Sequence, residues 1–369
     1  MNRFPAIDMA GALRLTRQGR LKEAVAVLRG KSAGAPPPQG EKPGAAGVLQ
    51  FVDNALKGTL GSLSLDAARV LKTPFRPAED NTPELEPEGS RFEERSFANE
   101  AGSRKYKLFI PSFYKGQQMP LVVMLHGCTQ SPDDFAAGTR MNDLAQMQGF
   151  LVAYPEQARS ANISKCWNWF NAANQRRDHG EASLIAGITR QVVDDFNVLP
   201  GRVYVAGLSA GGAAAAIMGS AYPELYAAIG VHSGLACGAA SDLHSAMSAM
   251  KHGAPPMPGR SNGSAKVIPA IVFHGDRDGT VNVANAQRVI EQAKGGAEFR
   301  AEVTEGEAGG IGFTRTVFAA EGRRPVLEEW VLHGAGHAWS GGSNAGSFTD
   351  THGPDASREM MRFFMSQPA

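Results

Sequence analysis

The sequence has little cysteine: Cys128, Cys166 and Cys237 are the three among 369 residues. An odd and sparse set argues against the disulfide frameworks that hold small secreted domains together. The sequence also lacks a Cys-x-x-Cys motif, so we expect no structural zinc site.

Long hydrophobic runs and an excess of one charge are also missing. No apolar stretch approaches the roughly 18 residues that cross a bilayer. The first residues, Met1–Met9, lack the continuous apolar stretch of a secretory signal. The formal net charge is +1, so the protein has no overall basic field and nothing in its charge suggests a nucleic-acid partner. We therefore expect a cytoplasmic protein with no membrane span and no nucleic-acid ligand, or a secreted one if the sequence has been trimmed.

The composition, 43% hydrophobic and 20% charged, is that of a globular protein with a large core. Residues 1–29 are predicted to form an amphipathic helical segment, which either packs on the main domain or docks on a partner or polymer surface. Residues 30–95, rich in glycine, proline and glutamate, are predicted to be a linker followed by an extended acidic segment. The catalytic domain is predicted to span residues 96–369.

Within the predicted catalytic domain, short apolar runs alternate with helical segments. Strands are expected at residues 104–110, 121–125, 150–154, 203–206, 227–231, 270–273 and 326–332. Helices are expected at residues 135–148, 181–196, 210–221 and 283–294. This alternation predicts an α/β fold, with a mostly parallel sheet covered by helices on both faces.

The stretch around which the chain is organised begins at Val203. A predicted buried strand leads directly into Gly207-Leu-Ser209-Ala-Gly211 and then into an alanine-rich predicted helix. This order is the context of the nucleophile elbow, in which a serine sits on a sharp, strained turn at the end of a strand. A phosphate-binding loop is less favoured, because no Lys-Ser/Thr pair follows the glycines. On this motif alone, an ordinary glycine-rich turn is the alternative.

A serine nucleophile needs a base to accept its proton. His337 fits this role, because it follows the last predicted strand in a glycine-flanked loop. His333 lies nearer the strand and is expected to be packed, and His352 lies in a later loop. We therefore predict His337 as the base, with a structural turn histidine as the alternative interpretation.

The acid that orients the histidine is predicted in the loop after the preceding strand. Asp278 lies four residues past His274, where the chain has left the strand. Asp276 is the alternative, since an aspartate in this position often caps its own turn. With Asp278, the chain order is serine, aspartate, histidine, as in the α/β-hydrolase fold.

Two backbone N–H groups are expected to form the oxyanion hole. Ala210 supplies one, because it follows the nucleophile at the start of a helix. Cys128 is the candidate for the second, with Thr129 as the alternative, because both leave an early strand at the same edge of the sheet.

Several motifs, in order along residues 92–366, resemble those of the esterase family of polyhydroxybutyrate (PHB) depolymerases. They are His126-Gly-Cys-Thr-Gln130, Tyr154-Pro-Glu-Gln157, Cys166-Trp-Asn-Trp-Phe170, Gly207-Leu-Ser-Ala-Gly-Gly212, Gly336-His-Ala-Trp-Ser-Gly-Gly342 and Gly353-Pro-Asp-Ala-Ser-Arg-Glu-Met360. The resemblance implies an α/β-hydrolase fold and ester hydrolysis through Ser209, Asp278 and His337, without a metal or organic cofactor. The motifs are also similar to those of feruloyl and acetylxylan esterases, which makes carbohydrate esters the alternative substrates. A non-catalytic protein that binds polymer granules is a second alternative.

Further features bear on the substrate and on the site. Trp167, Trp169 and Trp339 fall in loops near the predicted site and are candidate substrate-binding residues, since aromatic side chains suit an acyl chain, a phenolic ring or a sugar face. For Trp167 and Trp169, packing in the core is an equal alternative. Cys128 and Cys166 would brace the oxyanion hole if they formed a disulfide. The sequence leaves this pairing and the oligomeric state open.

Overall fold

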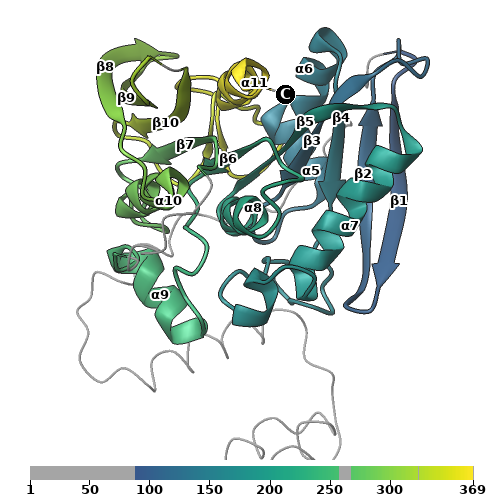
Figure 1. Cartoon of the computed structure of the whole chain (residues 1–369), viewed down its shortest axis with the longest axis horizontal. Coiled ribbons are helices and arrows are strands. Elements are labelled where there is room, and N and C mark those ends of the chain that lie inside the picture. The colour runs from purple at the N-terminus through teal and green to yellow at the C-terminus, as the bar shows by residue number, and fades with distance from the viewer. Residues whose placement is uncertain (1–87, 257–266, 323, 369) are drawn as a thin grey trace, which may run out of the picture. The chain divides into compact units, whose positions relative to one another are not determined.

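The computed structural model describes residues 88–256, 267–322 and 324–368. The helical segment predicted in residues 1–29 lies outside the described residues, as does most of the predicted segment 30–95. The described chain forms a ten-stranded sheet and a separate two-stranded pair (Figure 1). No described helix is both long enough and apolar enough to cross a membrane.

The strands of the large sheet are β1 (Arg91–Asn99), β2 (Gly102–Ile110), β3 (Met119–Leu125), β4 (Leu151–Pro155), β5 (Val198–Leu208), β6 (Ala228–His232), β7 (Ala270–Gly275), β8 (Arg300–Ala308), β9 (Ile311–Ala319) and β10 (Pro325–Leu332). The two-stranded pair consists of β11 (Trp339–Ser340) and β12 (Thr349–Asp350). The helices are α5 (Pro132–Thr139), α6 (Met141–Gln148), the short 3₁₀ helix η1 (Ala172–Gln175), α7 (Gly180–Asp195), α8 (Ala210–Ala221), α9 (Leu243–His252), α10 (Ala284–Lys294) and α11 (Ala356–Ser366).

The order of strands across the large sheet is β1-β2-β4-β3-β5-β6-β7-β10-β9-β8. The central strands, from β4 to β10 in this order, run parallel. The strands added at both ends pair antiparallel. Parallel neighbours need long crossover connections, which the helices provide. The predicted mostly parallel sheet is confirmed.

Helices cover both faces of the sheet, as β3 illustrates. Leu121 and Val123 belong to the core formed with α7, α8, α9 and α10. Val122 and Met124 point to the opposite face, where α5, α6 and α11 pack (Figure 1). Successive side chains of a strand alternate between the faces. A strand covered on both faces is therefore apolar throughout, which is why the sequence revealed the central strands.

The structure corrects the predicted elements in several places. β1 begins at Arg91, so the sheet starts before the predicted domain boundary at residue 96. The hairpin of β8 and β9 was not predicted, because β8 is exposed along almost its whole length and has no apolar face. The single helix predicted at residues 135–148 is divided into α5 and α6, since Arg140 between them adopts a left-handed backbone with φ 52°.

The topology brings the predicted catalytic residues to one edge of the sheet. The carboxyl ends of β5, β6, β7 and β10 lie side by side, because these strands are parallel neighbours. Ser209 follows β5, Asp278 lies in the loop after β7, and His337 lies in the loop after β10. Ligands of parallel sheets bind beyond this edge.

Candidate active site

Ser209 lies on the turn between β5 and α8, with a backbone conformation of φ 57° and ψ −120°. A positive φ is strained for a residue with a side chain, and such strain is concentrated at functional turns. A Cβ added at Gly207 would lie 2.4 Å from the backbone of Gly211, and one added at Gly211 would lie 1.9 Å from the carbonyl oxygen of Leu125. Only glycine fits at these two positions, and the tight turn that carries Ser209 depends on them.

Asp278 and His337 form a hydrogen-bonded pair, with 2.7 Å between Asp278 Oδ2 and His337 Nδ1. The Asp278 side chain is fully buried, and the His337 side chain is 12% exposed. The other carboxylate oxygen accepts hydrogen bonds of 2.8 Å from the N–H groups of Thr280 and Val281. These backbone donors fix the carboxylate against the imidazole. Because Nδ1 is held by Asp278, Nε2 is the ring nitrogen left for a reacting group.

Asp278 remains ionised although it is buried. Burial raises the pKa of its carboxyl, but hydrogen bonds with His274 and His337 outweigh this effect and hold the pKa well below its usual range. His274 is also buried, and its Nε2 lies 3.4 Å from Asp278 Oδ2 and 2.8 Å from the carbonyl oxygen of Val281. An ionised carboxylate at this place favours the His337 tautomer that carries its proton on Nδ1.

The alternative residues have other partners. Asp276 accepts a 2.7 Å hydrogen bond from the Gly334 N–H and lies 3.3 Å from Nδ1 of His333, so it caps the neighbouring loop. His333 is not packed as predicted, since its side chain is 48% exposed. The His352 side chain is 71% exposed. Asp276 and His333 therefore bind each other across two neighbouring loops, whereas Asp278 is paired with His337.

His232, at the end of β6, forms hydrogen bonds with both the turn that carries Ser209 and the loop that carries His337. Its carbonyl oxygen accepts a 2.9 Å hydrogen bond from the Ser209 N–H. Its Nε2 accepts a 3.1 Å hydrogen bond from the N–H of Ser340, three residues after His337. Burial lowers the pKa of His232 to about 3, so the ring is neutral near pH 7 and Nε2 can accept.

Residues 126–130, which follow β3, form a turn that we call the oxyanion loop. The loop lies beside the nucleophile, since a Cβ added at Gly127 would be 3.7 Å from Cβ of Ser209. On the other side of Ser209, Ala210 is the first residue of α8. The N–H groups in the first turn of a helix have no acceptor within the helix, so that of Ala210 is suited to an incoming oxyanion.

Within the oxyanion loop, the flanking N–H groups are occupied. The Gly127 N–H donates to Oε1 of Gln130 at 2.8 Å, and the Thr129 N–H donates to the carbonyl oxygen of Ser164 at 2.6 Å. Between them, the Cys128 N–H has no acceptor among the residues that the structure describes. The geometry therefore favours Cys128 over Thr129 as the second oxyanion donor.

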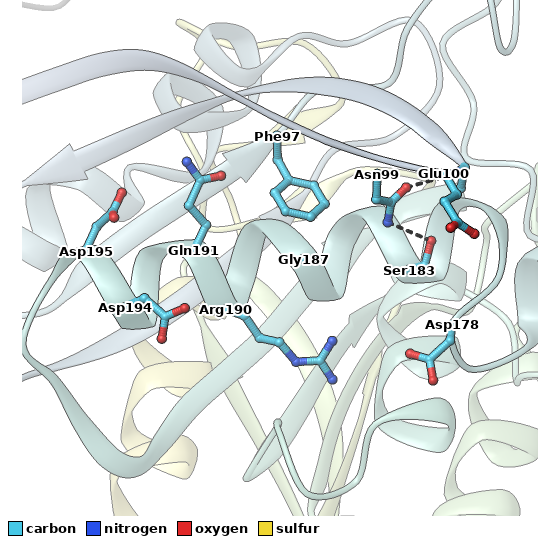
Figure 2. A pocket seen from close by; sticks show the side chains of 11 residues that line it. Phe97, Asn99, Glu100, Asp178, Ser183, Gly187, Arg190, Gln191, Asp194 and Asp195 are labelled. Carbon is cyan, nitrogen blue, oxygen red and sulfur yellow. Dashed lines mark hydrogen bonds between the residues drawn. The ribbon is translucent and has the colours of Figure 1, made fainter.

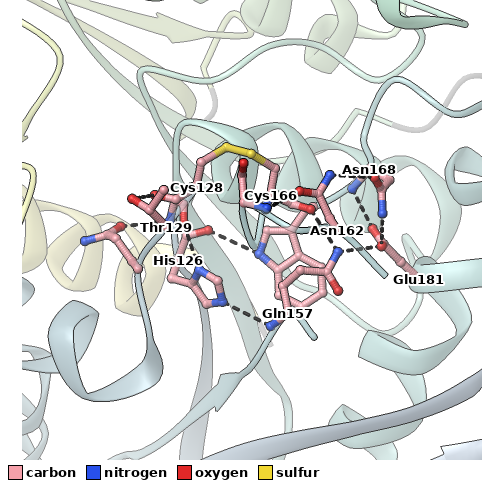
Figure 3. Close-up of a disulfide and its surroundings, with 12 residues drawn as sticks. His126, Cys128, Thr129, Gln157, Asn162, Cys166, Asn168 and Glu181 are labelled. Carbon is pink, nitrogen blue, oxygen red and sulfur yellow. Dashed lines mark hydrogen bonds between the residues drawn. A yellow bond between two sulfur atoms is a disulfide. The ribbon is translucent and has the colours of Figure 1, made fainter. Parts of the chain in front are cut away.

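Cys128 and Cys166 are joined in a disulfide that spans 38 positions of the sequence (Figure 3). The sequence left this pairing open. The bond ties the oxyanion loop to the segment after β4, which carries Cys166. It adds a covalent constraint to the loop that bears the candidate oxyanion donor.

Thiol titration tests the disulfide directly. Protein purified and denatured without reductant should react with Ellman's reagent at one of its three cysteines, and at all three after reduction. Cys128→Ala is the matched control, because loss of its partner should leave Cys166 reactive and raise the unreduced count by one. Three reactive thiols in the unreduced wild-type protein would show that the bond is absent.

The three tryptophans predicted to bind substrate are buried instead. Trp167 is 1%, Trp169 6% and Trp339 0% exposed. The indole N–H of Trp167 donates to the carbonyl oxygen of His126 at 3.2 Å, and that of Trp339 donates to the Ser357 hydroxyl at 3.1 Å. These side chains support the loops of the site from within the core. Their burial favours the packing alternative that the sequence left open for Trp167 and Trp169, and it does not support a substrate-binding role for Trp339.

A cleft of ≈ 550 Å³ lies between β1 and α7 (Figure 2). Its lining includes the ring of Phe97, Arg190 and several acidic side chains, among them Glu100 and Asp194. No candidate catalytic residue lines the cleft, so we do not assign it to the reaction. Within the described ranges, no group of three or more histidine, cysteine, aspartate or glutamate side chains is placed to hold a metal ion.

Comparisons with known proteins point to one family. Residues 104–310 match the family model described as Esterase PHB depolymerase. The chain is 31% identical to poly(3-hydroxyalkanoate) depolymerase C of Paucimonas lemoignei over 229 residues, which are 59% of this chain and 54% of that one. It is 32% identical to acetylxylan esterase A of Talaromyces purpureogenus over 119 residues, 32% of this chain and 30% of that one. The chain thus spans about half or less of the length of these relatives.

A solved structure agrees with the fold. Acetyl xylan esterase from Aspergillus awamori superimposes with a TM-score of 0.57 at 19% identity, covering 71% of this chain and 94% of that one. The predicted α/β-hydrolase fold is confirmed by this likeness and by the strand order. Since the family model matches more than half of the 369 residues, the chain belongs to the esterase family of PHB depolymerases.

Proposed function

We propose that this chain is a serine-dependent carboxylic ester hydrolase that forms an acyl-enzyme on Ser209. The observation that carries the proposal is the 2.7 Å hydrogen bond between Asp278 and His337 at the sheet edge where Ser209 occupies a strained turn. Membership of an esterase family supports the same reaction.

In the proposed reaction, Nε2 of His337 takes the hydroxyl proton of Ser209 while the oxygen attacks the ester carbonyl carbon. The N–H groups of Cys128 and Ala210 stabilise the negative oxygen of the tetrahedral intermediate. The intermediate then expels the alcohol, which receives the proton from His337, and the acyl group stays on Ser209. Water, activated by His337, releases the acid and restores the serine. Asp278 orients the imidazole throughout, and no metal or organic cofactor takes part.

We propose poly(3-hydroxybutyrate) or its oligomers as the substrate, because the family and a relative that aligns over 59% of this chain are both named for depolymerisation of such polyesters. The alternative is a carbohydrate ester. Relatives named feruloyl esterase B and acetylxylan esterase A support this alternative, although each aligns over about a third of the chain.

A matched substrate panel tests the choice. The panel holds short 3-hydroxybutyrate oligomers, amorphous PHB, methyl ferulate and acetylated xylan, with Ser209→Ala protein as the blank. We expect the highest kcat/KM on the hydroxybutyrate esters. Preference for ferulate or acetylated xylan would contradict the proposed substrate but retain the reaction. Turnover no faster than the blank on every member would contradict ester hydrolysis itself.

A further inference from the structure

A buried carboxylate lies behind the oxyanion loop and has no role in the steps described above. Glu181, in the first turn of α7, is 7% exposed. Its side chain accepts hydrogen bonds from Gln157 Nε2 at 2.5 Å, from Asn168 Nδ2 at 2.6 Å and from the Asn168 N–H at 2.7 Å (Figure 3). Arg104, also buried, places Nη2 3.6 Å from the carboxylate. A buried carboxyl group with this many donors fixes the positions of its partners.

The two residues that donate hydrogen bonds to the Glu181 side chain, Gln157 and Asn168, belong to the segment 157–168, which contacts the oxyanion loop directly. The Gln157 N–H donates to Nε2 of His126 at 3.1 Å. The indole N–H of Trp167 donates to the carbonyl oxygen of His126 at 3.2 Å. The same segment carries Ser164, which accepts from the oxyanion loop at Thr129 as described above, and Cys166 of the disulfide. The oxyanion loop is therefore held in place mainly by segment 157–168.

His126 transmits this restraint to the candidate oxyanion donor. Burial lowers the pKa of His126 to about 4, so the ring is neutral near pH 7. Since Nε2 accepts from Gln157, Nδ1 carries the proton and donates to the carbonyl oxygen of Gly127 at 2.7 Å. That carbonyl shares a planar peptide unit with the Cys128 N–H, and the two groups point in opposite directions in a trans peptide. The hydrogen bond from His126 to the Gly127 oxygen therefore fixes the direction in which the Cys128 N–H points.

We propose that Glu181 is a positioning residue for the oxyanion hole, acting through Gln157 and His126 on the peptide plane between Gly127 and Cys128. The inference rests on the proposed ester hydrolysis. A carboxylate suits this place because all of its neighbours are donors. An amide would turn its own NH₂ group toward at least one of them and leave buried groups without partners.

The test is Glu181→Gln, which keeps the shape of the side chain and removes acceptor capacity. Loss of one oxyanion donor typically costs about 10²- to 10³-fold in kcat. In Glu181→Gln the Cys128 N–H should be misaligned rather than lost, so we expect a smaller decrease, of about 10- to 100-fold, in kcat on a soluble ester. KM should stay within about threefold of the wild-type value, because binding of the substrate in its ground state does not use this donor.

Glu328→Gln is the matched control. Glu328, on β10, is 2% exposed and accepts hydrogen bonds from Arg315, Arg362 and Trp330. The substitution removes a buried carboxylate with at least as many donors, but these donors lie outside segment 157–168 and the oxyanion loop. We expect a comparable loss of stability and a kcat within about twofold of wild type, since the interaction removed is structural.

Amide hydrogen exchange gives a second readout that does not need turnover. Peptides covering residues 124–130 should exchange faster in Glu181→Gln than in Glu328→Gln at matched stability. If Glu181→Gln does not fold, Gln157→Met replaces it, because this change removes the amide that contacts Glu181 and keeps the N–H that binds His126.

The outcomes separate the two proposals. Turnover by wild type no faster than by Ser209→Ala would reject ester hydrolysis, whereas the exchange data would still decide whether Glu181 holds the oxyanion loop. Equal kcat losses in Glu181→Gln and Glu328→Gln, or unchanged exchange at residues 124–130, would overturn the role proposed for Glu181.

Discussion

Replacing Ser209 with alanine should lower kcat for ester hydrolysis by about 10⁴- to 10⁶-fold, because removal of the nucleophile leaves only binding and the oxyanion donors to act on the substrate. The rate of p-nitrophenyl butyrate hydrolysis measures this loss. The overall fold should persist, since the Ser209 side chain is partly exposed and its N–H, which binds His232, is retained.

Ser233→Ala is the matched control for this experiment. Ser233 also follows a parallel strand of the sheet and also has a positive φ, of 50°. Its hydroxyl lies 3.1 Å from Nδ1 of His232, so its removal should cost about one hydrogen bond and less than about tenfold in rate. Full activity of the Ser209→Ala protein, or an equal loss in both variants, would refute the assignment of the nucleophile.

Asp278→Asn should lower kcat by about 10³- to 10⁴-fold with little change in KM. The ionised carboxylate holds His337 with its proton on Nδ1 and stabilises the imidazolium that forms during the reaction. An amide can present its NH₂ group to Nδ1, which moves the ring proton to Nε2, where the base must be unprotonated. Steady-state kinetics on the same soluble ester measures the effect.

Asp276→Asn tests whether this loss is specific. Asp276 lies two residues away in the same loop and binds the Gly334 N–H and His333. Its substitution should lower kcat by less than about tenfold, because it changes only hydrogen bonds to the neighbouring loop. If Asp276→Asn is the more damaging change, the acid has been assigned to the wrong aspartate.

The parts of the site that could be predicted from the sequence are those marked by a short pattern of neighbouring residues. The glycines around Ser209 are required by the close approach of the turn to the backbone of β3, and such a turn leaves a short, recognisable pattern. Asp278 and His337 could be placed because each follows an apolar run, and the ends of parallel strands meet at one edge. The pairing of these residues then follows from the topology.

The parts that sequence did not predict depend on packing between distant segments. Trp339 sits among glycines in a loop, which resembles an exposed position, but its ring stacks on His232 and packs against Phe135. Glu181 lies in the first turn of a helix, where an acidic residue is ordinary. Its burial results from the segment 157–168, which folds over the start of α7, and no local pattern in the sequence reports such a contact.

The most direct test of the central claim is reaction of the folded protein with a fluorophosphonate probe, followed by mass spectrometry of its peptides. The probe modifies a serine only when a neighbouring base and oxyanion donors activate it. We expect one modification, on the peptide that contains Ser209, with none in Ser209→Ala and a much slower reaction in Asp278→Asn. Labelling at another serine at the same rate would contradict Ser209 as the nucleophile. Absence of labelling anywhere would contradict a serine hydrolase and leave a non-catalytic role for the chain.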